Sequence, residues 1–265
     1  MISFKQLQEH FPNTPKSKLF VQHMVKEYLQ IIILGKLYKT TSAPDIVFIG
    51  DTSLRLCYGL DRFSEDLDFD YMGNDREDLR EIFNNITKQL KLDGFKCSIE
   101  HNYKDTDNYY KIYFSGLSDY FPLTDTRKKI WIKIDIQKNY RPYNLARHFV
   151  NRFGLYYPVN LPEIDILFSM KAIALTQRVK ARDMYDFSFL QSNSKLNLNY
   201  IRCELLRKGM KVNTIEDVKK LILSKEKNID LKEKIHEISL FITNKENTSR
   251  VEHFFDFLRE LNFDL

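Results

Sequence analysis

The sequence has little cysteine and glycine and lacks any long apolar run. Its three cysteines (Cys57, Cys97 and Cys203) lie far apart and form no paired motif, which argues against a disulfide framework or a zinc site. The six histidines are scattered, without an HExxH-type pair, and the scarcity of glycine fits a bias toward A/T-rich codons. No apolar stretch approaches the roughly 20 residues of a membrane-spanning helix, and no signal-peptide pattern is present. We therefore expect a reduced, cytoplasmic protein without a membrane partner.

Length and charge set only wide limits. The 265 residues suffice for one large domain or two modest ones, and an apolar content of 43% is ordinary for a globular protein. The formal net charge of +5 permits an anionic partner such as a nucleotide or RNA, but solubility explains it equally well.

The spacing of apolar residues changes along the chain. Short strands with helices between them are predicted in the first part, whereas every element predicted after residue 162 is a helix. We therefore expect an α+β fold, with a mixed β-sheet and flanking helices in residues 1–150 and a helical bundle in residues 151–265. Strands are predicted at 45–49, 66–72, 95–101, 109–114 and 129–137, and helices within 1–40 and at 52–58, 79–92, 163–178, 182–190, 200–207, 215–224, 231–241 and 250–261.

Carboxylates alternate with apolar residues in the predicted strand 66–72. Because side chains alternate between the two faces of a strand, Asp66, Asp68 and Asp70 should share one face. Like charges on one face repel each other unless a cation lies among them. Magnesium is the natural candidate, because it prefers a few carboxylates together with phosphate oxygens and water. The simpler interpretation of this pattern is a solvated strand face.

A second alternating strand is predicted at 129–137. It places Trp131, Lys133 and Asp135 on one face and isoleucines on the other. If this strand lies beside the first, Asp135 joins Asp66 and Asp68 in an arrangement that can hold two divalent cations about 4 Å apart. Such a pair orients a nucleoside triphosphate and activates an attacking hydroxyl.

A glycine turn, Gly50-Asp51-Thr52-Ser53, joins a predicted strand to a predicted helix. Glycine lets backbone N–H groups approach a phosphate, and the hydroxyls of Thr52 and Ser53 can add hydrogen bonds. Asp51 would repel a triphosphate unless it faces a metal or, as Thr52 also can, caps the helix.

The loop before the carboxylate strand carries Arg62 and Ser64. Arg62 can clamp a phosphate or orient Asp66 and Asp68, or it can bridge to a nearby acid and order the loop. The sequence leaves these alternatives open.

A basic stripe is predicted if the helix within residues 169–186 is continuous. At 100° per residue, Lys171, Arg178 and Arg182 would then fall within about 20° of each other. Asp183 and Asp186 would hold the two arginines through ion pairs at helical spacing. This stripe can bind a triphosphate opposite the carboxylates, and the alternative is an exposed, salt-bridged helix.

Aromatic and basic residues interleave in Tyr140–Arg152. Such a mixture can contact single-stranded or looped RNA through stacking and phosphate contacts. A loop whose aromatic side chains pack against the core is the simpler and stronger interpretation.

Taken together, these motifs resemble those of the AbiEii-like nucleotidyltransferase toxins, a branch of the DNA polymerase β-type nucleotidyltransferase superfamily. The family pattern runs from a strand, Gly-Gly-Thr and a helix to Arg-x-Ser-x-Asp-hydrophobic-Asp, a Lys-x-Asp strand, and a helix with Lys, Arg and Arg-Asp-x-x-Asp. The resemblance covers residues 45–190, and Asp51 replaces the second glycine of the turn. The matching residues are Gly50-Asp51-Thr52, Arg62-Phe-Ser-Glu-Asp66-Leu-Asp68, Lys133-Ile-Asp135 and Lys171…Arg178…Arg182-Asp183-Met-Tyr-Asp186.

The resemblance implies a nucleotidyltransferase fold and a Mg²⁺-dependent transfer of a nucleoside monophosphate from an NTP to an acceptor. The acceptor would be RNA, which in some members of the family is a tRNA 3′ end, and the role would be that of a toxin in a toxin–antitoxin or phage-defence system, with a cognate antitoxin. The metal ligands would be Asp66, Asp68 and Asp135, which with Asp183 would be the catalytic residues. The NTP would be bound with the help of the helical domain, by Gly50, Thr52, Ser53, Arg62, Ser64, Lys171, Arg178 and Arg182.

Two other functions stay open at this point. Asp51 in the phosphate turn is compatible with a catalytically weakened nucleotide- or RNA-binding module of the same fold. The same carboxylates can also serve a two-metal nuclease, which would degrade RNA without added NTP.

Overall fold

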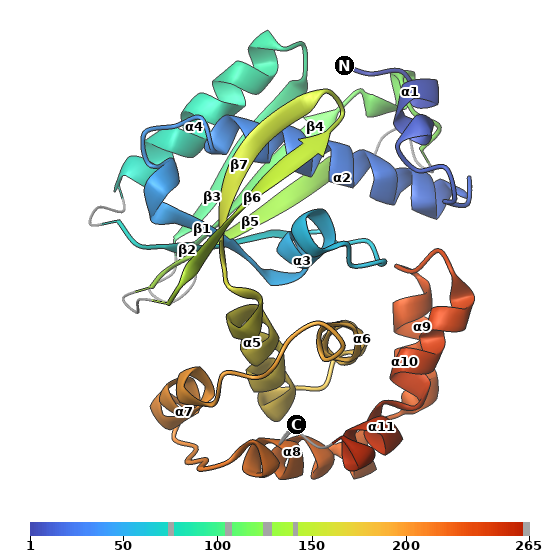
Figure 1. The fold of residues 1–265 in the computed structure, drawn as a ribbon. Coiled ribbons are helices and arrows are strands. Elements are labelled where there is room, and N and C mark those ends of the chain that lie inside the picture. The colour runs from blue at the N-terminus through green and yellow to red at the C-terminus, as the bar shows by residue number, and fades with distance from the viewer. Residues whose placement is uncertain (74–76, 104–107, 124–128, 140–142, 262–265) are drawn as a thin grey trace. The chain divides into compact units, whose positions relative to one another are not determined.

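The computed structural model describes residues 1–73, 77–103, 108–123, 129–139 and 143–261. The chain divides into two compact units, Met1–Leu161 and Pro162–Leu265 (Figure 1). The sequence-based boundary at residue 150 falls inside a β-hairpin of the first unit. The expected α+β architecture is confirmed, since the first unit holds a mixed sheet with helices and the second is helical.

The first unit contains every strand of the described part of the chain. Its helices are α1 (Phe4–Glu9), α2 (Lys18–Leu37), α3 (Gly50–Tyr58) and α4 (Glu77–Leu92), with 3₁₀ turns at Ala43–Asp45 and Leu117–Asp119. Its strands are β1 (Ile46–Ile49), β2 (Leu67–Tyr71), β3 (Lys96–Tyr103), β4 (Asn108–Ser115), β5 (Ile130–Lys138), β6 (Leu145–Arg152) and β7 (Leu155–Pro162).

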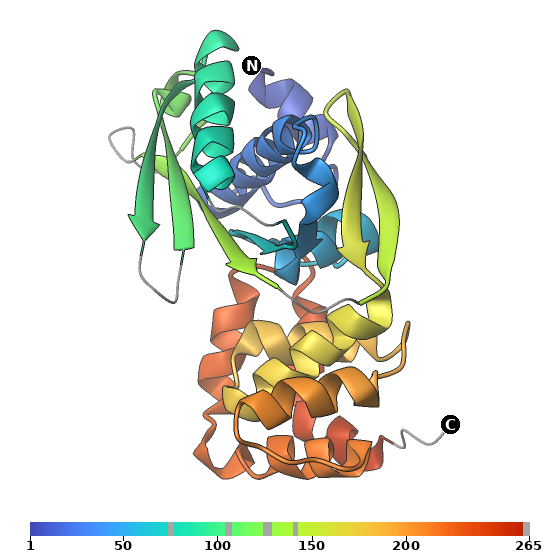
Figure 2. The same cartoon turned by 90° about the vertical axis from the view of Figure 1, so that its left-hand side faces the viewer.

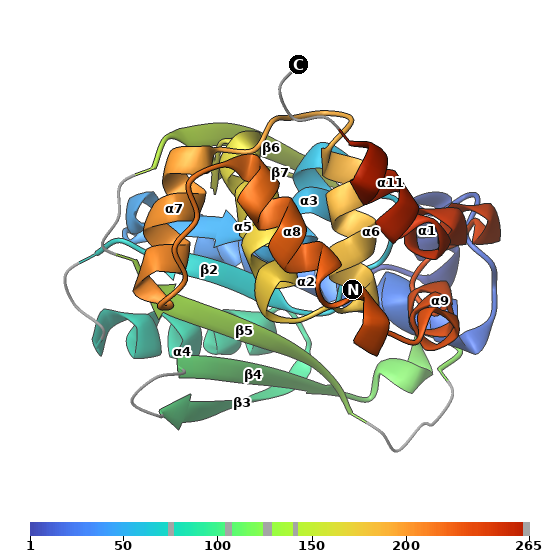
Figure 3. The ribbon, with the colours of Figure 1, turned by 90° about the horizontal axis from the view of Figure 1, so that it is seen from below.

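Five strands form one mixed sheet in the order β1-β2-β5-β4-β3, which Figure 3 shows from below. The central pair, β2 and β5, is parallel, and the other neighbours are antiparallel. Parallel pairing requires a long connection between the two strands, and here it contains α4, β3 and β4. This crossover brings the two carboxylate-bearing strands together although they lie more than 60 residues apart in sequence.

One face of this sheet is buried beneath α2 and α4 (Figure 2). The isoleucines of β5 lie on it and are buried, while the intervening Trp131, Lys133 and Asp135 are half-buried, so the predicted alternation is confirmed. On β4, Tyr110 packs its ring 4.4 Å from that of Phe83 on α4. Apolar burial on this face stabilises the sheet and leaves the opposite face available for polar side chains.

The sequence did not predict the hairpin formed by β6 and β7, which make a separate two-stranded sheet. Its turn consists of Phe153 and Gly154, with φ angles of 53° and 73°. A positive φ is rare for phenylalanine, so this turn carries no usual sequence signal. Tyr157 on β7 is buried and donates to the carbonyl of Ile31 at 2.7 Å. The stretch 140–152, for which a loop packed against the core was the favoured interpretation, contains strand β6, on which Phe149 is exposed, and its residues 140–142 lie outside the described residues.

The second unit is built from helices. Pro162 ends β7, and α5 begins at Ile164, one residue after the expected start. The last predicted helix is two helices, separated at His253. Among the described residues, no helix combines the length and the apolar character needed to span a membrane. The helices are α5 (Ile164–Gln177), α6 (Ala181–Leu190), α7 (Leu198–Arg207), α8 (Ile215–Leu223), α9 (Leu231–Ser239), α10 (Ser249–Glu252) and α11 (Phe254–Glu260), with 3₁₀ turns at Glu226–Asn228 and Lys245–Thr248.

Candidate functional site

Two of the predicted carboxylates face each other across the parallel strands. Asp68 on β2 lies directly opposite Asp135 on β5, and both are half-buried. Asp66 immediately precedes β2. Asp70 is different: it is buried, and its carboxylate accepts hydrogen bonds from Gln137, Asn139 and Tyr143 at 3.0, 2.6 and 2.5 Å. Asp70 therefore ties β2 to the end of β5, whereas Asp68 and Asp135 face the more open part of the sheet.

Lys133 lies among the carboxylates. Its ammonium is 2.6 Å from an oxygen of Asp135. Burial lowers the pKa of Lys133, but the hydrogen bond to Asp135 and the negative charges of Asp135, Asp66 and Asp68 more than offset this, so its pKa is raised above the ordinary value. These four side chains therefore form one electrostatic cluster on the sheet, in which the lysine reduces the repulsion between acids.

The glycine turn approaches Asp68 closely. Gly50 has a φ of 75°, and a Cβ added to it would contact a carboxylate oxygen of Asp68 and lie 2.9 Å from its Cγ. The predicted cap at Asp51 or Thr52 is wrong, because α3 begins at Gly50 itself and no side chain at Ile49 caps it. Glycine is thus required here for both backbone conformation and space.

Hydroxyl groups tie the loop before β2 to the start of α3. The Thr52 hydroxyl donates a hydrogen bond to the carbonyl of Asp66, and it lies 2.8 Å from the hydroxyl oxygen of Ser64. Within α3, the Ser53 hydroxyl donates to the carbonyl of Gly50 at 2.8 Å. Thr52, Ser53 and Ser64 are all buried. These contacts position Asp66, and a direct contact of the three hydroxyls with an NTP stays a prediction.

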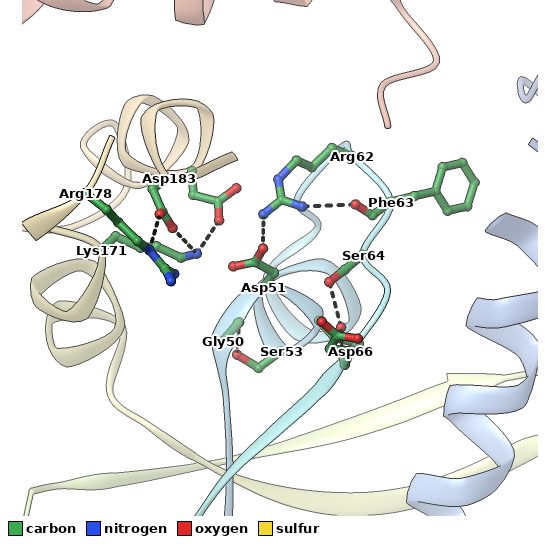
Figure 4. Close-up of polar contacts among 12 residues, drawn as sticks. Gly50, Asp51, Ser53, Arg62, Phe63, Ser64, Asp66, Lys171, Arg178 and Asp183 are labelled. Carbon is green, nitrogen blue, oxygen red and sulfur yellow. Dashed lines mark hydrogen bonds and ion pairs between the residues drawn. The ribbon is translucent and has the colours of Figure 1, made fainter. Parts of the chain in front are cut away.

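Arg62 bridges to an acid, which is one of the alternatives that the sequence left open. Its fully buried guanidinium lies 2.6 Å from the carboxylate of Asp51 and donates to the carbonyl of Phe63 at 3.0 Å (Figure 4). The negative charge of Asp51 is therefore balanced within the loop.

We expect Gly50→Ala to destabilise the protein more than Gly59→Ala does. Both glycines have a positive φ, 75° and 76°, so both substitutions strain the backbone by about 1 to 2 kcal/mol. A Cβ at Gly59 would meet nothing within 4 Å, whereas one at Gly50 would collide with Asp68, which adds about 1 to 3 kcal/mol. Thermal unfolding of the two variants measures the difference, and equal losses would contradict the close approach of the turn to Asp68.

The second unit carries a buried ion cluster in place of the predicted basic stripe. The helix is not continuous, because Arg178 adopts an extended conformation (φ −143°, ψ 151°) between α5 and α6. This break lets Lys171 reach both Asp186, at 2.6 Å, and Asp183, at 3.3 Å (Figure 4). Twelve residues along an unbroken helix would separate Lys171 from Asp183 by about 18 Å. All three charged groups are buried, so the alternative of an exposed helix is also wrong.

The two arginines behave differently from each other. Arg178 contacts Asp183 at 3.3 Å, as predicted, although its side chain is 58% exposed. Arg182 instead places its guanidinium 5.0 Å from the centre of the Phe241 ring, so its predicted ion pairing is wrong. Because of the break, Asp183 and Asp186 contact Lys171. The continuous helical spacing between the arginines and these acids, which the ion-pair prediction assumed, is therefore absent.

Sequence reasoning left out two residues of these clusters. Lys133 was named on a strand face and in the Lys-x-Asp motif but was given no role, although its position two residues before Asp135 places both on the same side of β5. Asp186 was assigned to the arginines, but it is fully buried against Lys171. An acid three residues after Asp183 on an otherwise apolar helical face was the available signal.

The carboxylates have the chemistry of a divalent-cation site. Within the described ranges, no three Asp, Glu, His or Cys side chains converge as a ready-made metal centre. Asp68 and Asp135 nevertheless supply oxygen donors from paired positions on one face of the sheet, with Asp66 just before β2, and hard cations prefer such ligands. The three carboxylates outnumber the single Lys133 among them, so the cluster keeps an excess of negative charge that attracts a cation.

Comparison with known proteins gives one family and several similar structures. The model of the family described as "Nucleotidyl transferase AbiEii toxin, Type IV TA system" matches residues 32–260, whereas no curated protein matches the chain. Among solved structures, JHP933 from Helicobacter pylori is 21% identical over 90% of this chain and 92% of its own, with a TM-score of 0.56. The nucleotidyltransferase toxin MenT4 from Mycobacterium tuberculosis is 20% identical over 92% of this chain and 86% of its own, with a TM-score of 0.51. At these identities the structures support the fold alone.

Proposed function

This chain belongs to the AbiEii family of nucleotidyltransferase toxins of type IV toxin–antitoxin systems, and we propose that it transfers a nucleoside monophosphate from an NTP to a hydroxyl of RNA with Mg²⁺, which releases pyrophosphate. The matched residues 32–260 include every residue of the candidate site. The proposal includes a cognate antitoxin as partner and a cytoplasmic location, where NTPs and RNA are both found.

The opposition of Asp68 and Asp135 on β2 and β5 carries the proposal. Two carboxylates on adjacent rigid strands hold their oxygens in fixed positions, which is what transfer chemistry on a triphosphate requires. Asp66, Asp68 and Asp135 would hold Mg²⁺, which would neutralise the charge of the triphosphate and activate the acceptor hydroxyl. Lys133 would balance the excess negative charge of this cluster.

The remaining predicted residues divide into positioning and binding roles. We assign positioning to Thr52, Ser53 and Ser64, whose contacts lie within the loop, and to Arg62, which balances Asp51. Gly50 leaves space beside Asp68. From the second unit, Lys171, Arg178 and Arg182 are proposed to bind the NTP, with Asp183 as a further acid. Because Arg62 already engages Asp51, the departure from Gly-Gly-Thr is no longer a reason to favour a weakened binding module.

Incubation with each labelled NTP, Mg²⁺ and total RNA tests the proposal. Wild-type protein should label RNA with at least one NTP, and Asp135→Asn or removal of Mg²⁺ should abolish the labelling. Without NTP the RNA should stay intact, which separates transfer from a two-metal nuclease. Mg²⁺ should also raise the melting temperature of wild-type protein but not of Asp135→Asn. Absence of a labelled product with every NTP, together with no effect of Mg²⁺ on melting, would contradict the proposal.

A further inference from the structure

The half-buried face of the main sheet carries a group of lysines and aromatic rings beside the candidate site. Strand pairing places Tyr109 of β4 opposite Asp135 of β5, and the next same-face pairs are Lys111 with Lys133 and Tyr113 with Trp131. We call Tyr109, Lys111, Tyr113, Trp131 and Lys133 the lysine–aromatic face. Its side chains are half-buried, and the opposite sides of β4 and β5 supply the core.

The ammonium groups of this face lie on aromatic rings. Lys111 is 5.0 Å from the ring centre of Trp131 and 5.3 Å from that of Tyr109, and Lys133 is 5.1 Å from that of Tyr109. Lys26 of α2 also lies over Trp131, at 5.2 Å, but it forms an ion pair with Glu65 at 2.7 Å. The π faces of Tyr109 and Trp131 are therefore turned toward lysine ammonium groups.

Among the described residues Lys111 forms no ion pair, although strand pairing places Glu100 of β3 opposite it. Like charges directly opposite each other on neighbouring strands are destabilising, and Lys111 lies opposite Lys133. Lys133 is balanced by Asp135. In the part of the chain that the structure describes, Lys111 contacts only the two rings, and the carboxylate of Glu100 on β3 instead accepts a hydrogen bond from Tyr113 at 2.9 Å. The ammonium of Lys111 thus lies against rings and not in an ion pair, and an anion bound there would gain a charge-assisted contact.

We propose that the lysine–aromatic face binds the single-stranded end of the RNA acceptor, an inference that rests on the proposed function. Bases of an unpaired end would stack on Tyr109 and Trp131. A backbone phosphate would form an ion pair with the ammonium of Lys111 and replace its contacts with the rings. Bases within a duplex are already stacked and cannot use such surfaces. Because Tyr109 lies directly opposite Asp135, a nucleotide stacked on this ring would carry its terminal hydroxyl to the carboxylates.

Binding of a labelled single-stranded RNA oligonucleotide, measured by fluorescence anisotropy at several salt concentrations, tests this surface. Tyr109→Ala should weaken binding about tenfold, and Tyr109→Phe, which keeps the ring, should bind nearly as wild type does. Lys111→Gln should lower the slope of log affinity against log salt by about 0.7, the value for one lost phosphate contact on a single strand. Lys88→Gln removes the same charge from an exposed position on α4 and should change nothing.

Calorimetric titration of the same variants with NTP and Mg²⁺ distinguishes a wrong RNA-binding surface from a wrong proposed function. NTP affinity should be unchanged in Tyr109→Ala and Lys111→Gln at a temperature where both variants are folded. If both variants bind RNA as wild type does while wild type still labels RNA, the lysine–aromatic face is not the RNA-binding surface, and the proposed function stands. If NTP affinity falls instead, the face holds the base of the NTP and the inference is overturned. If wild type binds NTP but neither binds nor labels RNA, the proposed acceptor itself is wrong.

Discussion

Replacement of Asp68 by asparagine should reduce nucleotide transfer by about 10³-fold while leaving the stability of the protein nearly unchanged. The substitution removes one charge from the opposed pair with Asp135, and several kcal/mol of metal-assisted transition-state stabilisation corresponds to this loss of rate. Stability should change by less than about 1 kcal/mol, because the side chain is only half-buried and loses repulsion from Asp135 as well as attraction to Lys133. Initial rates of RNA labelling and thermal unfolding measure the two effects.

Asp70→Asn is the matched control, since it makes the same change two residues along the same strand. Asp70 is buried and accepts three hydrogen bonds, from Gln137, Asn139 and Tyr143. Loss of its charge weakens all three, and the amide group places a donor where donors already point, so we expect a destabilisation of about 1 to 3 kcal/mol. The folded variant should still transfer nucleotides.

The two variants together therefore distinguish catalysis from folding. If Asp70→Asn abolished transfer at a temperature where the variant is folded, or if Asp68→Asn remained active, the assignment of roles along β2 would be wrong. Loss of both activity and stability in Asp68→Asn would indicate that Asp68 is a structural residue of the strand.

The strands that carry the site could be predicted because their side chains alternate clearly. In β5 the isoleucines fix one buried face, and this places Lys133 and Asp135 together on the other face. The sequence could not establish that β2 and β5 are neighbours, because parallel pairing joins strands that are distant in the chain. The resemblance to a known family led to the expectation that Asp135 joins Asp66 and Asp68.

Tertiary contacts explain what the sequence did not reveal. The break between α5 and α6 lies where the predicted helices 163–178 and 182–190 leave a gap, although no glycine or proline within residues 177–181 marks it. It allows Asp183 and Asp186 to meet Lys171, a contact that no local propensity indicates. Likewise, the partner of Arg62 is Asp51, and sequence patterns alone did not distinguish a nearby acid from a phosphate as this partner.

The second large effect that we expect is a loss of about 3 to 5 kcal/mol of stability in Lys171→Met. The substitution preserves most of the side-chain volume but removes the cation from between two carboxylates that are 4% and 0% exposed. Breaking a buried ion cluster by removing one partner is costly, because a desolvated charge loses its compensation. Chemical denaturation of the full chain measures this loss.

Arg178→Met is the control for Lys171→Met, because Arg178 contacts the same Asp183 from a side chain that is 58% exposed. A solvent-exposed pair contributes little, so this variant should lose less than about 1 kcal/mol. Equal effects of the two substitutions would show that the Lys171 cluster is not the buried anchor of this unit.

A double variant separates the structural role of Lys171 from its proposed role in NTP binding. Lys171→Met combined with Asp186→Asn removes the carboxylate that lies 2.6 Å from the ammonium, so it should recover part of the stability lost by Lys171→Met alone. If Lys171 binds phosphate, the double variant should remain folded yet bind NTP about tenfold more weakly, because one charge-assisted contact to the triphosphate is lost.

If the folded double variant binds NTP with wild-type affinity, Lys171 serves only to hold α5 and α6 together. The phosphate contacts must then come from other residues, with Arg178 the first to test, because its exposed guanidinium is already directed by Asp183.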